Sequence, residues 1–260
     1  MQIFGMTDIG RERLVNQDDF IAKELLPGLA LLCVCDGMGG VAGGKEASAI
    51  AIRAFYDSVA EKADACYDPE TGYFTADTEK IMSDLAEAAQ KANRAVFERA
   101  EHRPELQGMG TTLAAALVSR DLLCGINIGD SRVYTCSRDG DMRQLSRDHS
   151  YVQYLVDLGR ISEDEARTDK NRNIITRAVG IAPGLATDVF SAVVEDSRVL
   201  ICSDGLSANA ENAVIGKYLA DFSLPTETIV RRLVNLANEE GGSDNITAVM
   251  AFTGEEEQKG

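Results

Sequence analysis

The sequence predicts an α+β fold in which a largely antiparallel sheet system is covered by helices. Strand-like segments occur in adjacent groups along the chain, and long helical segments lie between these groups. A doubly wound parallel sheet would instead show a regular alternation of strands and helices, which this sequence lacks. We find no internal repeat and no linker rich in proline, glycine or serine. We therefore expect one domain over residues 1–253, followed by a short acidic tail at 254–260.

The individual elements are predicted from the spacing of apolar residues. Short apolar segments with β-branched or alternating residues, bounded by turn residues, indicate strands. These are 19–25, 29–35, 112–119, 122–128, 132–137, 187–194, 198–203 and 245–252. Helices are indicated where apolar residues recur at three- and four-residue steps, as Ile81, Leu85, Ala88, Ala92 and Val96 do. The predicted helices are 45–62, 78–100, 151–158, 209–219 and 226–239.

The composition is that of an acidic protein with enough apolar residues for a core. The 260 residues carry a formal net charge of −16, and 45% of them are hydrophobic. This charge would repel phosphates and anionic lipids, so we expect neither nucleic acid nor a membrane as a partner. The N-terminus lacks the long apolar region of a signal peptide. Most cysteines lie in apolar segments, where a free thiol behaves as a small hydrophobic group, so we expect a reduced, cytoplasmic protein.

Aspartates stand at the margins of several buried strands. Asp36, Asp130 and Asp204 follow strongly apolar segments, and Asp244 immediately precedes one. Carboxylates grouped at one rim of a core would repel each other, and a bound divalent cation removes that repulsion. Ligands that are all oxygen favour Mg²⁺ or Mn²⁺ over Zn²⁺. The glycines after Asp36 allow close backbone approach, so the carbonyl of Gly37 is a further candidate ligand.

The glycine-rich stretch "GMGGVA" after Asp36 also matches a dinucleotide-binding loop. Two features oppose that interpretation. Asp36 would place a negative charge beside the pyrophosphate. The acidic residue that the fingerprint requires about 20 positions further on is absent, because Asp57 falls inside a predicted helix.

Near the N-terminus, Arg13 and Asp18 stand just before the first predicted strand. A guanidinium close to a metal site is suited to binding a phosphate with two hydrogen bonds. The ordinary alternative for Arg13 is a surface salt bridge.

Several stretches, taken together and in this order, resemble the metal-dependent protein phosphatases of type 2C, the PPM family, in its compact bacterial form. The matching stretches are "TDIGRERLVNQDDF", "VCDGMGGVAGGKEAS", "GMGTTLAAALV", "INIGDSRVY", "SRDHSYVQYLVDLGRISEDEA", "NIITRAVG", "LICSDGLS" and "GGSDNITAVM". They cover nearly the whole chain, from residue 6 to residue 252. Each motif alone would be weak, whereas the ordered set is specific.

The resemblance implies a four-layer α-β-β-α sandwich, with two mostly antiparallel sheets flanked by helices and a flap near residues 146–180. It also implies two Mn²⁺ or Mg²⁺ ions bridged by Asp36. The Gly37 carbonyl would bind one ion, and Asp204 and Asp244 would bind the other. A third, weaker ion would use Asp130 together with Asp204.

The resemblance further implies hydrolysis of phosphoserine and phosphothreonine in proteins by a metal-activated water. Arg13 matches the family's phosphate-binding arginine, and Asp18 would act near the metals, mostly through water. In animal members a histidine follows the Asp-Gly pair and protonates the leaving group. This chain has Met38 there, so the general acid stays open, and His149 in "SRDHS" is expected to be a turn residue.

The expected partners are phosphorylated protein substrates, with a cognate serine/threonine kinase and its targets, and we expect a monomer. Two other functions are alternatives. The first is an inactive family relative that binds phosphoproteins, which the intact set Asp36, Asp204 and Asp244 opposes. The second is a nucleotide-binding oxidoreductase, which rests on the glycine pattern alone.

Overall fold

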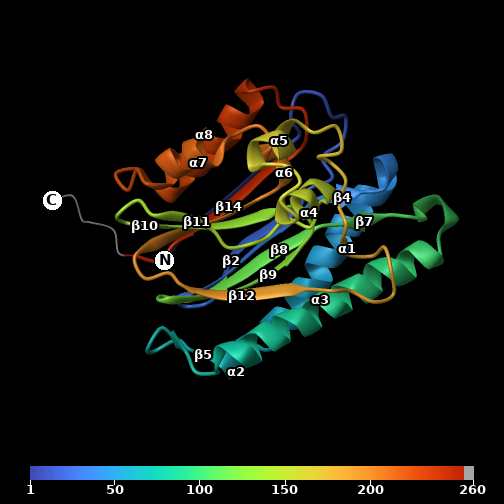
Figure 1. The fold of residues 1–260 in the computed structure, drawn as a ribbon. Helices are drawn as coiled ribbons and strands as arrows, with labels where there is room; N and C mark the ends of the chain where they lie inside the picture. Colours follow the sequence, from blue (N-terminus) through green and yellow to red (C-terminus); the bar gives the residue numbers. More distant parts are fainter. Residues whose placement is uncertain (255–260) are drawn as a thin grey trace.

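A computed structural model describes residues 1–254, so the predicted tail beyond Gly254 lies outside the described residues. Two five-stranded sheets face each other in the middle of the molecule, and helices cover the outer side of each (Figure 1). This confirms the predicted four-layer sandwich. Every strand pair in the described part of the chain is antiparallel.

The first sheet has the strand order β12-β9-β8-β3-β2. Its strands are β2 (Asp19–Leu26), β3 (Leu29–Cys35), β8 (Leu113–Val118), β9 (Leu122–Ile128) and β12 (Asp188–Val193). All of β3 and β8 is buried, because one face packs on helices and the other packs on the second sheet. That double burial explains why both strands are continuously apolar rather than alternating.

The second sheet has the order β1-β14-β13-β10-β11. Its strands are β1 (Gln2–Asp8), β10 (Arg132–Ser137), β11 (Met142–Gln144), β13 (Ser197–Cys202) and β14 (Ile246–Phe252). The two edge strands, β1 and β11, were not predicted. Their residues are half-buried or exposed, so they lack the apolar signal by which the central strands were recognised.

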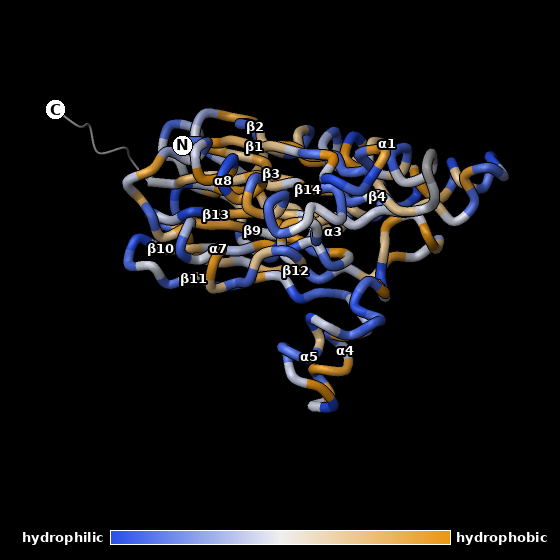
Figure 2. Tube along the Cα trace, turned by 90° about the horizontal axis from the view of Figure 1, so that it is seen from above, coloured by the Kyte–Doolittle hydropathy of each residue, from blue (hydrophilic) through white to orange (hydrophobic). Residues whose placement is uncertain are grey.

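Four helices form the outer layers. Helices α1 (Gly40–Ala60) and α3 (Thr78–Glu101) pack against each other and cover the first sheet. Helices α7 (Asn212–Leu219) and α8 (Thr226–Glu239) cover the second. Apolar residues accordingly concentrate along the strands (Figure 2), and buried apolar residues of the helices pack against them. No helix in residues 1–254 combines the length and apolarity that crossing a membrane requires.

Smaller elements complete the chain. Two short antiparallel pairs are formed by β4 (Gly37–Met38) with β7 (Gly110–Thr111) and by β5 (Tyr67–Asp68) with β6 (Tyr73–Phe74). Helix α2 (Ala63–Cys66) and the 3-10 turn η1 (Pro104–Leu106) lie beside α1 and α3. The predicted flap holds α4 (Tyr151–Asp157) and α5 (Glu163–Thr168), and it projects from the sandwich (Figure 2).

Two predicted helix boundaries are wrong. The helix expected at 45–62 begins earlier, at Gly40, because Gly39 supplies a left-handed N-cap with φ 118° that turns the chain straight from β4 into α1. The helix expected at 209–219 begins only at Asn212. A separate short helix, α6 (Asp204–Ser207), precedes it, so Asp204 is the first residue of a helix directly after β13.

Candidate functional site

One pocket of about 550 Å³ opens at the end of the sandwich where β3 and β13 finish. It brings together residues that are far apart in the sequence, and six of the seven predicted site residues line it. The predicted residues in its wall are Arg13, Asp36, Gly37, Asp130, Asp204 and Asp244. Asp18, the seventh, is buried, and its carboxyl group interacts electrostatically with Asp204 and Asp244.

Asp36 is fixed by its backbone at the end of β3. Its amide donates to the Thr112 hydroxyl at 2.9 Å, and its carbonyl accepts from the Thr112 amide at 2.9 Å and the Thr111 hydroxyl at 2.8 Å. These bonds use only the backbone of Asp36, and the residue lines the pocket. Burial raises the pKa of Asp36 well above its usual range, and the charges of Asp18 and Asp204 raise it further.

Gly37 occupies a position where no side chain fits. A Cβ atom there would lie 2.1 Å from the Gly44 carbonyl oxygen and 2.7 Å from that of Gln17. The backbone at Gly37 is therefore packed between the start of α1 and the loop before β2. This crowding gives a physical reason for glycine after Asp36 that needs no bound nucleotide.

Asp204 begins α6, with Ser203 as its N-cap residue. Burial and the Asp244 charge raise the pKa of Asp204, while a hydrogen bond with the Asp36 carboxyl group lowers it. The Asp204 Oδ1 atom is buried and has no hydrogen-bond partner. A buried carboxylate oxygen without a partner is costly, and a ligand would remove that cost.

Asp18 supports the floor of the pocket. Its Oδ2 atom accepts hydrogen bonds from the Ser203 hydroxyl at 2.8 Å and the Thr247 hydroxyl at 2.6 Å, which tie β2, β13 and β14 together. Its Oδ1 atom is buried without a partner. Burial is the main reason that the pKa of Asp18 rises to about 7, because the two hydroxyl donors only partly offset it.

Arg13 is half-exposed at the mouth of the pocket. Its Nη2 atom donates a 2.6 Å hydrogen bond to Asp244 Oδ2. That hydrogen bond is the main reason that the pKa of Arg13 is raised. The structure thus places the guanidinium in an ion pair, but the pair lies within the carboxylate cluster and not on a distant surface.

The carboxyl groups fit a hard divalent cation. Their ligand atoms are all oxygen, and two buried oxygens lack partners. Burial, and after it repulsion between the carboxylates, raises the pKa values of Asp36 and Asp130. Within residues 1–254, no three Asp, Glu, His or Cys side chains already form a closed ligand cluster. A bound ion would therefore complete its shell with water and main-chain oxygen, which is ordinary for Mg²⁺.

Asp130 stands in the turn between β9 and β10, and His149 holds that turn in place. The Gly129 amide donates to His149 Nδ1 at 3.1 Å, and the His149 amide donates to the Gly129 carbonyl at 2.8 Å. His149 Nε2 lies 3.0 Å from Asp188 Oδ2, and Arg177 Nη1 donates to Asp188 Oδ1 at 2.6 Å. His149 is buried, so it is more than the turn residue that the sequence suggested.

Asn245 is another residue that the sequence analysis missed. Its Nδ2 atom donates to the carbonyls of Ile9 and Val15, and its Oδ1 atom accepts from the Gln17 amide at 2.8 Å. One buried side chain therefore fixes the whole loop that carries Arg13. The only sequence signal for this role was its place beside Asp244.

No histidine lines the pocket within the described residues. His149 is engaged with Gly129 and Asp188, and the exposed His102 contacts the Glu98 carbonyl at the end of α3. Met38 does line the pocket, as its position after Gly37 predicts. The antiparallel sheets also lack the parallel βαβ unit that a dinucleotide loop requires, so the oxidoreductase alternative is wrong.

The chain is similar to known proteins over almost its full length. The sequence profile of the protein phosphatase 2C family matches residues 9–251. The serine/threonine phosphatase stp of Listeria innocua is 35% identical over 248 residues, which cover 94% of this chain and 92% of that protein. The serine/threonine protein phosphatase PstP of Mycobacterium tuberculosis is also 35% identical, over 94% of this chain and 43% of that protein.

Solved structures agree with this similarity. The crystal structure of the M. tuberculosis phosphatase PstP superposes with a TM-score of 0.82 at 34% identity, covering 96% of this chain and 97% of that one. The catalytic domain of PstP, solved in complex with two manganese ions, superposes with a TM-score of 0.79 at 33% identity over the same shares of the two chains.

Proposed function

The chain belongs to the protein phosphatase 2C family, and on that premise we propose that the carboxylate-lined pocket is its active site. The protein is a metal-dependent protein-serine/threonine phosphatase that uses Mn²⁺ or Mg²⁺. The observation that supports the assignment of the site is the group of five aspartates around one pocket, two of which have a buried oxygen without a partner. The same group opposes the alternative of an inactive relative.

Asp36, Asp204 and Asp244, with the Gly37 carbonyl, would hold two cations, and Asp130 with Asp204 would hold a third. Bound divalent cations supply a nucleophile from water at neutral pH and neutralise charge on the phosphoryl group. Without such neutralisation, the clustered carboxylates would repel a phosphate ester. The pocket wall contains no cysteine, so no thiol is placed for a covalent step.

The other residues of the pocket would bind the substrate phosphate or hold the pocket in shape. Arg13 would exchange its hydrogen bond to Asp244 for one to the substrate phosphate, at the same mouth of the pocket. Asp18 would keep the floor rigid through Ser203 and Thr247 and accept hydrogen bonds from water with its free oxygen. Asn245 positions the Arg13 loop.

The substrates are phosphoproteins, and a cognate serine/threonine kinase with its targets would supply them. We further propose that residues 1–253 act as one domain and as a monomer. A cytoplasmic location is supported by six cysteines that are all buried and unpaired, as expected where thiols stay reduced.

The test is hydrolysis of a phosphothreonine peptide with added Mn²⁺, with Mg²⁺, and in excess chelator. We expect turnover with either ion and none in chelator. Asp36→Asn should be folded and inactive, and Asp57→Asn, an exposed aspartate on α1, is the matched control. Full turnover in chelator, or an active Asp36→Asn variant, would overturn the proposed site.

A further inference from the structure

Leu14 is the most exposed large apolar residue in the described chain. The residue is 94% exposed, although it lies in the wall of the pocket beside Arg13. Exposed single leucines are common on surfaces, so exposure alone means little. The position is informative because the neighbouring side chain is the one expected to hold the substrate phosphate.

The loop that presents Leu14 is held in place at both ends and in the middle. Asn245 bonds the carbonyls of Ile9 and Val15. The Arg11 amide donates to the Gly242 carbonyl at 2.7 Å, and Arg11 Nε donates to the Asn238 carbonyl at 2.6 Å. The backbone is therefore held on both sides of Leu14, and the residue itself is exposed.

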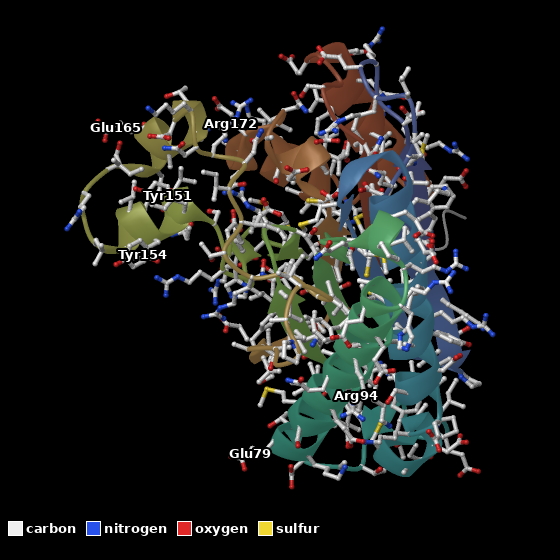
Figure 3. The ribbon with its side chains drawn as sticks, turned by 90° about the vertical axis from the view of Figure 1, so that its right-hand side faces the viewer. Glu79, Arg94, Tyr151, Tyr154, Glu165 and Arg172 are labelled. Carbon is white, nitrogen blue, oxygen red and sulfur yellow. The ribbon has the colours of Figure 1, made fainter. Side chains whose placement is uncertain are left out.

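Further apolar side chains share this pocket wall. Val15 lies next to Leu14, and the flap contributes Ile175. The aromatic residues of the flap, Tyr151 and Tyr154, lie on its projecting part (Figure 3) and do not line the pocket. Leu14, Val15 and Ile175 thus form an apolar part of the pocket wall, in addition to Met38.

From this arrangement we propose that Leu14 is a specificity-determining residue that contacts an apolar side chain next to the phosphorylated residue of the substrate. The proposal rests on the proposed active site, because Arg13 sets where the phosphate binds. In the substrate, the Cα atoms of the phosphorylated residue and its neighbour are about 3.8 Å apart. Adjacent substrate residues can therefore reach adjacent side chains of this loop. Burying the Leu14 side chain against an apolar neighbour removes both surfaces from water.

The test compares phosphothreonine peptides that differ in one residue. One peptide has glycine on both sides of the phosphothreonine, and the others have leucine immediately before or immediately after it. We expect one leucine peptide to have a kcat/KM about three- to tenfold above that of the glycine peptide, chiefly through a lower KM. Leu14→Ala and Leu14→Asp should abolish this ratio while both variants still hydrolyse the glycine peptide.

Val193→Ala is the matched control, since Val193 is a 77% exposed apolar residue on edge strand β12 and does not line the pocket. It should keep the preference. Equal kcat/KM values for all three peptides, or an undiminished preference in Leu14→Ala, would overturn the role of Leu14 while leaving the phosphatase assignment intact. Failure to hydrolyse even the glycine peptide with Mn²⁺ would overturn both.

Discussion

Arg13 and Asp244 form an ion pair across the mouth of the pocket, with Arg13 Nη2 at 2.6 Å from Asp244 Oδ2. The pair joins the residue expected to bind phosphate to one expected to bind metal. Because both side chains are partly exposed, the pair itself contributes little to stability. As a consequence, Arg13 and a bound cation compete for the Asp244 carboxylate, because the ion pair with Arg13 weakens the attraction of Asp244 for the cation.

Arg13→Ala should therefore change substrate and metal binding in opposite directions. We expect KM for a phosphopeptide to rise about 10- to 100-fold, with a smaller change in kcat, because a charge-assisted hydrogen bond to the phosphate is lost. The Mn²⁺ concentration for half-maximal activity should fall about two- to fivefold, since Asp244 loses its cationic partner. Steady-state kinetics at a series of Mn²⁺ concentrations measures both effects.

Arg53→Ala is the control for that experiment, because Arg53 is exposed on α1 and its ion pair is with Asp57, at 4.0 Å. It should leave both constants unchanged. If Arg13→Ala behaves like Arg53→Ala, Arg13 is an ordinary surface residue.

Asp204→Asn should remove activity without weakening the metal-free fold. The amide keeps the shape of the side chain and removes a negative charge that is desolvated and repelled by Asp244. We expect the melting temperature in chelator to be unchanged or higher. Saturating Mn²⁺ should raise the melting temperature of the wild type more than that of the variant. A ligand that binds the folded state raises its stability, and the variant should bind Mn²⁺ more weakly. Near-parental turnover, or a lower melting temperature in chelator, would contradict this role.

The metal-free protein should lose stability as pH rises from about 4 to about 7. In the unfolded chain Asp18 ionises near its ordinary pKa of 3.8, whereas in the folded protein burial raises that pKa to about 7. Across this window Asp18 binds more protons in the folded state, so each rise in pH favours unfolding, and Asp18 contributes up to about 4 kcal/mol.

Urea unfolding in excess chelator at several pH values measures this loss. Asp18→Asn should flatten the curve, since the amide oxygen can still accept from Ser203 and Thr247 without titrating. An equal slope in the variant would assign the pH dependence to other carboxyl groups of the pocket.

Much of the fold could be predicted from the sequence because its central strands are strongly apolar, and several of these strands end at aspartates that line the pocket. Asp36 and Asp204 were conspicuous for that reason. Edge strand β1 and flap helix α5 were missed, since half-exposed segments carry no strong periodicity.

Residues whose role lies in long-range hydrogen bonds could not be predicted. Arg198 is almost fully buried in β13 and donates to the carbonyls of Leu219, Asp221 and Leu224. Nothing in its local sequence distinguishes it from a surface arginine. The same holds for His149, whose partners are 20 and 39 residues away.

Variants of Asp130 and His149 distinguish two roles of this turn, binding of a cation and structural support. Asp130 lines the pocket, while His149 fixes the turn through Gly129. If Asp130 is a metal ligand, Asp130→Ala should lower kcat or raise the Mn²⁺ requirement with little change in melting temperature. A turn cap would instead cost about 1 kcal/mol of stability and spare catalysis, by analogy with helix caps.

His149→Ala should instead lower stability more than it lowers activity. It leaves the buried Gly129 amide without an acceptor, which costs about 1–3 kcal/mol, or several degrees in melting temperature. His149→Asn should recover part of that loss, because its Oδ1 atom can take the place of Nδ1. Calorimetry in chelator and kinetics across Mn²⁺ concentrations measure the two properties separately.

Asp130 would belong to the turn if Asp130→Ala melted several degrees lower with kcat and metal dependence unaltered. Equal stability of the two His149 variants would mean that the Gly129 bond does not hold the turn.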